Sequence, residues 1–137
     1  MTVTPGVYQL RIRLRRAARI RVGALGGVRF AVGWYIYTGS ARSGLVQRIQ
    51  RHLRSRKRKH WHIDYLLAVA AQMEAFVLPG VDVAECQLHR TMAGGQTPVP
   101  GFGSSDCGCR SHLAYFKRRP GIGLMTWREF SRRHEIV

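Results

Sequence analysis

The first part of the chain alternates apolar and polar residues with a period of two. Over residues 6–14, the apolar side chains from Tyr8 to Leu14 fall on one face and arginines on the other. The alternation continues over residues 19–25 and 28–38. This pattern predicts half-buried strands. Because short turns separate the three strands, we expect them to form an antiparallel meander.

In the third of these strands, the alternation predicts tyrosines on the polar face. Tyr35 and Tyr37 fall on the opposite side from the apolar series that runs from Val28 to Ile36. Tyrosine is common in strands, so this placement alone assigns no role. Gly39 follows directly, and glycine there permits a tight turn or a close approach of a phosphate to the backbone.

Further along, the apolar residues recur with the period of a helix. Residues 44–58 carry a stripe at Leu45, Ile49 and Leu53, with Ser43 as a possible N-cap. After it we expect a helix that begins near residue 62 and a strand over 74–79. A further helix should run from 81 to the glycines at 94 and 95, and a loop should follow over 94–111. The chain should end with an edge strand over 111–116 and a helix over 125–134 capped by Thr126. This order predicts a single α+β domain over residues 1–137, in which helices pack on a small, mostly antiparallel sheet.

Charge narrows the range of partners. The chain has 23 Lys and Arg against seven Asp and Glu, a formal net charge of +16. Such an excess favours a polyanion, and guanidinium groups match phosphate oxygens in pairs. Nucleic acid is preferred to a membrane because no segment is clearly a basic amphipathic surface helix or long enough to span a bilayer. The chain start lacks the layout of a secretory signal, so we expect a cytoplasmic protein.

The three cysteines do not make the framework of a secreted disulfide protein. Cys86, Cys107 and Cys109, together with His112, supply four possible zinc ligands. However, the spacing of Cys107 and Cys109 is not the usual C-x₂-C, and Cys86 is remote. Reduced thiols are therefore the preferred interpretation, and zinc is the alternative.

Two residues of the first predicted helix share a face. Arg48 and His52 are four residues apart, at the edge of the apolar stripe. Ordinary surface charge on a basic helix explains them at least as well as chemistry does. Arg51, Arg54 and Arg58 are expected further out, on a solvated basic face.

The segment "HWHIDY", residues 60–65, holds further polar candidates. Asp64 is expected in the first turn of the second helix, where its charge favours the positive end of the helix dipole. His62 is left open as a residue that could lie near a site.

Several of these stretches together carry a resemblance. "GVY" at 6–8, "YTG" at 37–39 and "LVQRIQRH" at 45–52 resemble the signature of the GIY-YIG nucleases. The longer stretches at 44–67 and 101–113 are similar to a small GIY-YIG-like family whose members also occur fused to endonuclease III-type DNA glycosylases. The first two motifs are further apart than in better-known members, which implies an extra hairpin over residues 15–34.

The resemblance implies a role for each matching position. Tyr8 and Tyr37 match the two motif tyrosines, one of which orients or deprotonates the attacking water. Arg48 matches the arginine that neutralises charge on the attacked phosphate, and His52 matches a position that could relay a proton. Glu85 matches the carboxylate that holds one divalent ion, Mg²⁺ or Mn²⁺, and among the seven acids it has no obvious structural role.

The chain contains no Asn, which many relatives place near the metal or the phosphate. Residues of the long loop are expected to stand in for it by touching phosphate or by holding the catalytic residues: Ser104, Ser105 and Asp106. The residues expected to bind nucleic acid are Ser40, Arg51, Arg54, Lys57, Arg58, Lys59 and His62.

Charge and resemblance together predict a metal-dependent endonuclease that hydrolyses phosphodiester bonds in DNA. The glycosylase fusions suggest, by analogy, an abasic or damaged site in repair and a functional link to a glycosylase. Two alternatives remain: a non-catalytic basic module that binds DNA or RNA, and a ribosomal or other RNA-binding protein.

Overall fold

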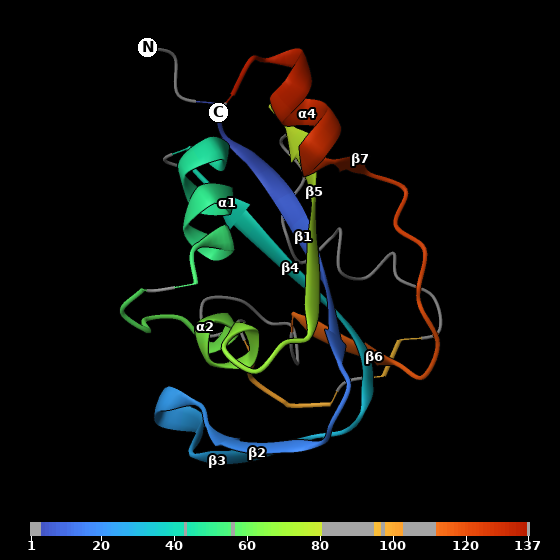
Figure 1. Cartoon of the computed structure of the whole chain (residues 1–137). Helices are drawn as coiled ribbons and strands as arrows, with labels where there is room; N and C mark the ends of the chain where they lie inside the picture. The colour runs from blue at the N-terminus through green and yellow to red at the C-terminus, as the bar shows by residue number, and fades with distance from the viewer. Residues whose placement is uncertain are drawn as a thin grey trace.

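The computed structural model describes residues 4–42, 44–55, 57–80, 95–96, 98–102 and 112–136. Within these residues an antiparallel five-stranded sheet runs through the molecule (Figure 1), in the order β6-β4-β1-β5-β7. Its strands are β1 (Gly6–Leu14), β4 (Gly33–Ala41), β5 (Gln72–Pro79), β6 (Leu113–Phe116) and β7 (Met125–Thr126). The predicted α+β class is confirmed, and so is the edge position of the strand at 113–116.

The connection between β1 and β4 differs from the predicted meander. β1 pairs along its whole length with β4, and the segment between them forms a separate hairpin of β2 (Ala18–Arg21), the short 3₁₀ helix η1 (Gly23–Leu25) and β3 (Gly27–Phe30). The hairpin implied over residues 15–34 is thus confirmed, and the meander is wrong. The backbone bends between β3 and β4, where Gly33 has φ +144°, a value that residues with a side chain rarely adopt.

Because of this bend, the side chains of β4 that face the core are not the ones that the alternation predicts. Tyr35 and Tyr37 lie opposite Ile12 and Leu10 in the register of β1 and β4, and all four side chains are buried. Cross-strand neighbours share a face, so both tyrosines point into the core. The prediction that they occupy the polar face is wrong, because the alternation of faces in β3 does not continue through the bend at residues 31–33.

Two helices lie on the core face of the sheet. α1 (Leu45–Leu53) contacts β1, β4 and β5 and buries Leu45 and Ile49, while α2 (His62–Leu67) follows it in the chain. α1 ends at Leu53 rather than at the predicted residue 58, since Arg54 is extended. Leu53, the last residue of the predicted apolar stripe, is 46% exposed and does not join the core.

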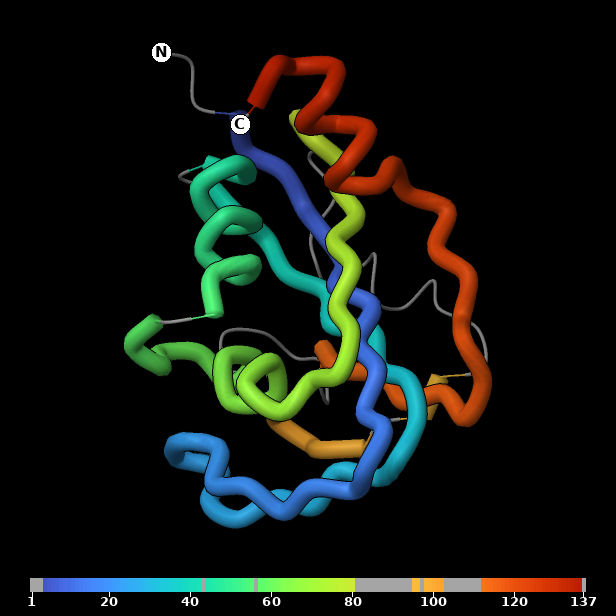
Figure 2. Tube along the Cα trace, viewed as in Figure 1, coloured from blue at the N-terminus to red at the C-terminus, as the bar shows by residue number. Residues whose placement is uncertain are grey.

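The opposite face of the sheet is also covered. Gln9 and Arg11, predicted to be on the polar face of β1, are buried. One Arg11 amino group donates to Glu74 at 2.8 Å and the other to the carbonyl of Pro120 at 2.9 Å. Figure 2 shows the chain after β6 running along this side of the sheet to the last helix.

The last helix begins where the sequence predicts. α4 (Trp127–Arg133) has Thr126 as its N-cap, and the Thr126 hydroxyl accepts from the backbone N–H of Glu129 at 3.1 Å. None of the helices in the described part of the chain is both long and apolar enough to cross a bilayer.

Candidate functional site

Strands β1 and β4 bring the two motif tyrosines together. The ring centres of Tyr8 and Tyr37 are 6.4 Å apart. Tyr8 lies opposite Gly39, and a Cβ atom at Gly39 would be 2.5 Å from the phenol carbon and oxygen of Tyr8. Gly39 is therefore required because the tyrosine ring lies directly on it. Gly39 lies within strand β4, so the tight turn that a glycine permits does not form there.

The hydroxyl of Tyr8 is hydrogen-bonded to His52. The distance from the phenol oxygen to Nε2 is 2.7 Å, and the residues are 1% and 2% exposed. Burial, the largest cause, and the charges of Lys57, Arg48 and Arg51 together lower the pKa of His52 to about 3, against the opposing effect of Asp64. The imidazole is therefore neutral at neutral pH. A neutral Nε2 can accept the phenol hydrogen.

Arg48 lies beside this pair and is partly exposed. Its Nη1 donates to the backbone oxygen of Ser40, at the end of β4, at 2.8 Å. Its guanidinium carbon is 4.3 Å from the ring centre of Trp61, and the His52 ring is 6.0 Å from the same ring. The structure thus gathers Tyr8, His52 and Arg48 from β1 and α1, with Trp61 beside the last two.

Trp61 is a site residue that the sequence reasoning missed. The guanidinium carbons of Arg48 and Arg51 lie 4.3 and 4.2 Å from the centre of its ring. Such contacts of cations with an indole face are attractive and restrict the arginine side chains. A tryptophan directly after a strongly basic segment is the signal that would have pointed to it.

Arg51 does not belong to a solvated face, contrary to the prediction. Its two amino groups donate to the two carboxylate oxygens of Asp64 at 2.8 and 2.9 Å, and the Asp64 side chain is fully buried. Asp64 also accepts from the backbone N–H groups of His60 and Trp61. Burial alone would raise the pKa of Asp64, but these hydrogen bonds lower it to about 2. The expected position of Asp64 in the first turn of α2 is confirmed.

Lys57 is also committed within the fold. Its ammonium group donates to the carbonyls of His52 at 2.9 Å and Arg54 at 2.8 Å, and more weakly to that of Arg51 at 3.3 Å. These carbonyls end α1, where a cation is favourable. The role of Lys57 in binding nucleic acid therefore stays a prediction, and the fold already uses its ammonium group.

Basic residues at the end of α1 and in the segment after it surround a hollow. This basic cavity has a volume of about 440 Å³ and is lined by Arg51, Arg54, Lys57, Arg58, Lys59 and His60. Arg54, Arg58 and Lys59 are exposed, so their charges remain available to an anion. A concave surface lined by cations concentrates the field that attracts phosphate.

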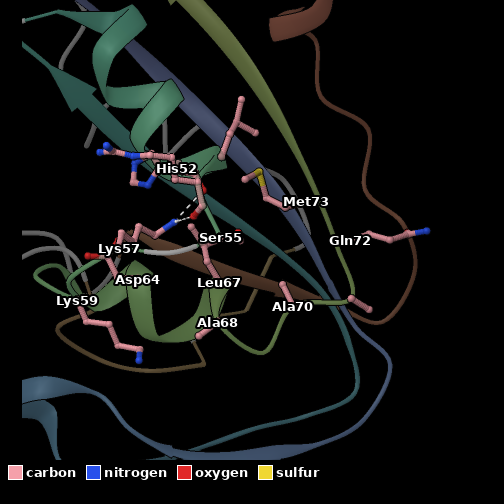
Figure 3. A pocket seen from close by; sticks show the side chains of 13 residues that line it. His52, Ser55, Lys57, Lys59, Asp64, Leu67, Ala68, Ala70, Gln72 and Met73 are labelled. Atoms are coloured by element: carbon pink, nitrogen blue, oxygen red, sulfur yellow. Dashed lines mark hydrogen bonds between the residues drawn. The ribbon is translucent and has the colours of Figure 1, made fainter.

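A second hollow of about 230 Å³ lies between the end of α1, α2 and the start of β5 (Figure 3). It shares Arg54, Lys57 and Lys59 with the basic cavity, and its other wall is largely apolar, with Leu67 and Met73. Both hollows therefore open beside the segment that joins α1 to α2.

His62 lies two rings away from Tyr37. Its ring centre is 5.5 Å from that of Phe102, which is 6.1 Å from that of Tyr37. Partial burial lowers the pKa of His62. One ring, that of Phe102, thus separates His62 from Tyr37, and the role of His62 at the site stays a prediction.

Several predicted residues lie outside the described ranges: Glu85, Cys86, Ser104, Ser105, Asp106, Cys107 and Cys109. The remaining candidate zinc ligand, His112, is buried, and its carbonyl accepts from Thr38 N–H at 3.0 Å. Among the described residues there is no group of three or more His, Cys, Asp or Glu side chains that could hold a metal. The metal predictions therefore remain predictions.

Comparison with known proteins gives a family. No curated protein matches the chain, and no solved structure does. A family model described as "Domain of unknown function DUF123" matches residues 7–132. The match spans both motif tyrosines, α1 and α2, which is nearly the whole chain. The protein therefore belongs to the DUF123 family.

Proposed function

We propose that the protein is an endonuclease of the GIY-YIG type that hydrolyses phosphodiester bonds, with DNA favoured over RNA as its substrate. The observation that carries the proposal is the 2.7 Å hydrogen bond between the Tyr8 hydroxyl and a neutral His52. A phenol oxygen orients water best when a second group accepts the phenol hydrogen and leaves the oxygen lone pairs to the water. The Tyr37 ring, 6.4 Å away, borders the same position.

In this mechanism each residue has a separate role. His52 holds the hydrogen of the Tyr8 hydroxyl, so that a lone pair of the phenol oxygen can orient the attacking water. Arg48 is held by the Ser40 carbonyl and the Trp61 ring, and it directs its remaining N–H donors at the phosphate oxygens. Fixed donors that meet developing charge stabilise the transition state without further reorganisation.

The proposal assigns one divalent ion, Mg²⁺ or Mn²⁺, to Glu85. Such an ion is commonly bound through one or two carboxylates, with waters and substrate oxygens as its other ligands. When bound, it would stabilise charge on the phosphate and on the leaving oxygen. Asp64, a carboxylate whose charge acts on His52, is hydrogen-bonded to Arg51 and to two backbone N–H groups.

The substrate is proposed from charge and from the resemblance. The basic cavity would hold phosphates that flank the attacked bond, through Arg54, Arg58 and Lys59, without reading bases. Membership of the GIY-YIG superfamily and the link to glycosylases belong to this proposal. They suggest an abasic or damaged site as the target and a cytoplasmic repair role.

A second candidate is a non-catalytic module that binds nucleic acid. The burial of Tyr8 and His52, at 1% and 2% exposure, favours it, because a structural hydrogen bond needs no access for substrate. In this case the basic cavity would bind the backbone and the tyrosine pair would only stabilise the sheet against α1.

A cleavage assay separates the two candidates. End-labelled intact, nicked, abasic and single-stranded DNA, with RNA counterparts, would be incubated with Mg²⁺ or Mn²⁺. The nuclease proposal predicts cleavage by the wild-type protein, and a loss of about 100-fold or more for Tyr8→Phe and for Glu85→Gln with binding retained. Arg128→Ala, on an exposed face of α4, is the control. Binding without cleavage of any substrate supports the non-catalytic module.

A further inference from the structure

The hairpin between β1 and β4 is firmly attached to the body of the protein. Its inner face buries Phe30, whose ring meets those of Tyr35 and Phe102 edge-on at 5.9 and 6.2 Å. Beside its base, the hydroxyl of Tyr35 donates to the carbonyl of Ala31 at 2.7 Å. The hydroxyl of Tyr115 likewise donates to the carbonyl of Val32 at 2.6 Å. The hairpin therefore holds its outer face in a fixed position.

That outer face consists of arginines. In the register of β2 and β3, Arg19 lies directly opposite Arg29, and Arg21 lies opposite Gly27. All three arginines are exposed, whereas Ile20 is partly buried against the core. Residues 15–34 contain five arginines and no acid. No ion pair in the described part of the chain involves the three.

This arrangement is unfavourable for the hairpin taken alone. Like charges directly opposite each other on a strand pair are destabilising. Packing is already supplied by the inner face, so the arginines have no role there. A partner that carries closely spaced negative charge would remove the repulsion between Arg19 and Arg29.

We propose that the outer face of the hairpin, defined by Arg19, Arg21 and Arg29, is a second contact surface for the phosphate backbone of duplex nucleic acid. The surface has no aromatic side chain, which binding of a single strand normally uses for stacking. It also has no amide side chain that could read a base edge, so it would bind without regard to sequence. A two-stranded ribbon of this kind is narrow enough to follow a groove of the duplex.

The position of the hairpin suits this role. A Cβ atom at Gly23, in η1, would be 3.7 Å from the Tyr65 hydroxyl, so the end of the hairpin borders α2. Lys59 of the basic cavity has its ammonium group 6.0 Å from the Tyr65 ring centre. Figure 1 shows α1, α2 and the hairpin in succession along one side of the view. A duplex that reaches the basic cavity would thus extend toward the hairpin.

Salt dependence of binding tests the inference. Binding of a fluorescent duplex would be measured in EDTA, which prevents metal-dependent cleavage, for the wild-type protein and for a variant with Arg19→Gln, Arg21→Gln and Arg29→Gln. Each lost phosphate contact lowers the slope of log K against log salt by about 0.9, so we expect a decrease of about 2 to 3. A control with Arg118→Gln, Arg128→Gln and Arg132→Gln removes the same charge from exposed positions elsewhere and should lower the slope by less than about 1.

The melting temperature of the hairpin variant should be unchanged or higher, since the variant relieves like-charge repulsion. If the triple variant fails to fold, the three single variants decide, each with an expected decrease in slope of about one. Equal slopes for the hairpin and control variants would overturn the inference. So would unchanged duplex binding accompanied by lost binding to anionic phospholipid vesicles, which would assign the surface to a membrane.

The inference depends on the proposed function only for the nucleic-acid partner. A protein that binds duplex through the hairpin but cleaves nothing would refute the nuclease and leave this inference standing.

Discussion

At the scale of single residues, the candidate site depends on one close contact between two strands. The Tyr8 ring lies on Gly39 and reaches His52 from there. The resemblance pointed to Tyr8 and His52. For Gly39 the sequence indicated only a tight turn or the close approach of a phosphate to the backbone. The actual reason is space for a ring, which no local pattern shows, because it depends on the register of two strands about 30 residues apart.

Replacement of Gly39 by alanine should move Tyr8. The new methyl group would lie 2.5 Å from the phenol, so the ring must shift and its hydrogen bond to His52 must weaken. We expect a destabilisation of about 1–3 kcal/mol, typical of overpacking. Urea unfolding measures it, with Gly27→Ala as the control, because a Cβ atom at Gly27 meets nothing within 4 Å. Equal effects of the two substitutions would contradict this packing.

The buried His52 predicts how stability depends on pH. Its pKa is about 3 in the folded protein against 6.5 ordinarily, so below pH 6.5 the unfolded chain takes up a proton that the folded chain does not. Stability should therefore fall as the pH drops from about 6.5 toward 3, by at most about 1.4 kcal/mol per pH unit from this residue. Asp64 contributes at lower pH, because its stabilising effect is lost between its ordinary pKa of 3.8 and about 2.

Urea unfolding between pH 7 and pH 4.5 checks this prediction. His52→Gln should give a shallower pH dependence than the wild-type protein. His62→Gln is the comparison, since burial also lowers the pKa of His62 and it contributes in the same direction. An unchanged pH dependence in His52→Gln would show that this imidazole is not buried in its neutral form.

At the scale of elements, α1 and α2 are joined by polar contacts rather than by a long apolar seam. Arg51 of α1 pairs with Asp64 of α2, and Lys57 from the connecting segment caps the carbonyls at the end of α1. The periodicity predicted where α1 begins but placed its end at residue 58. The end could not be predicted, because it depends on a cation that folds back from outside the helix.

Asp64→Asn should be strongly destabilising. Asparagine keeps one acceptor for the backbone N–H groups but leaves Arg51 without a counter-charge at a site where the side chains are 18% and 0% exposed. We expect a loss of about 2–4 kcal/mol in the free energy of unfolding, below the full cost of a buried pair because Arg51 reaches some solvent. Glu129→Gln, at the exposed pair with Arg133, should change it by less than about 1 kcal/mol. Similar changes in the two variants would contradict the structural role of Asp64.

At the scale of the whole molecule, periodicity predicts the strands other than β7 and the first two helices, and the cap at Thr126 predicts where the last helix begins. The cap expected at Ser43 is wrong, because Gly44 is the N-cap of α1 and makes no side-chain cap hydrogen bond.

The prediction for Tyr35 and Tyr37 is wrong because the backbone bends between β3 and β4. Arg11 is buried because a segment some 110 residues later packs against it. The bend depends on the backbone conformation of Gly33, and the burial of Arg11 on a contact between distant parts of the chain. The contact of Trp61 with Arg48 also joins separate segments of the chain, so no local pattern predicts it. The roles assigned to Tyr8, Arg48 and His52 remain predictions.

The catalytic proposal is tested most directly by the single-turnover rate of DNA cleavage by Arg48→Ala, with duplex binding measured in parallel and Arg128→Ala as the control. We predict that the rate falls by about 100-fold or more, because Arg48 is assigned to the developing charge on the phosphate. The dissociation constant should change much less, since Arg48 would be one phosphate contact among several. An Arg48→Ala protein that cleaves as fast as the control, or a wild-type protein that cleaves no nucleic acid with either metal, would contradict the proposal.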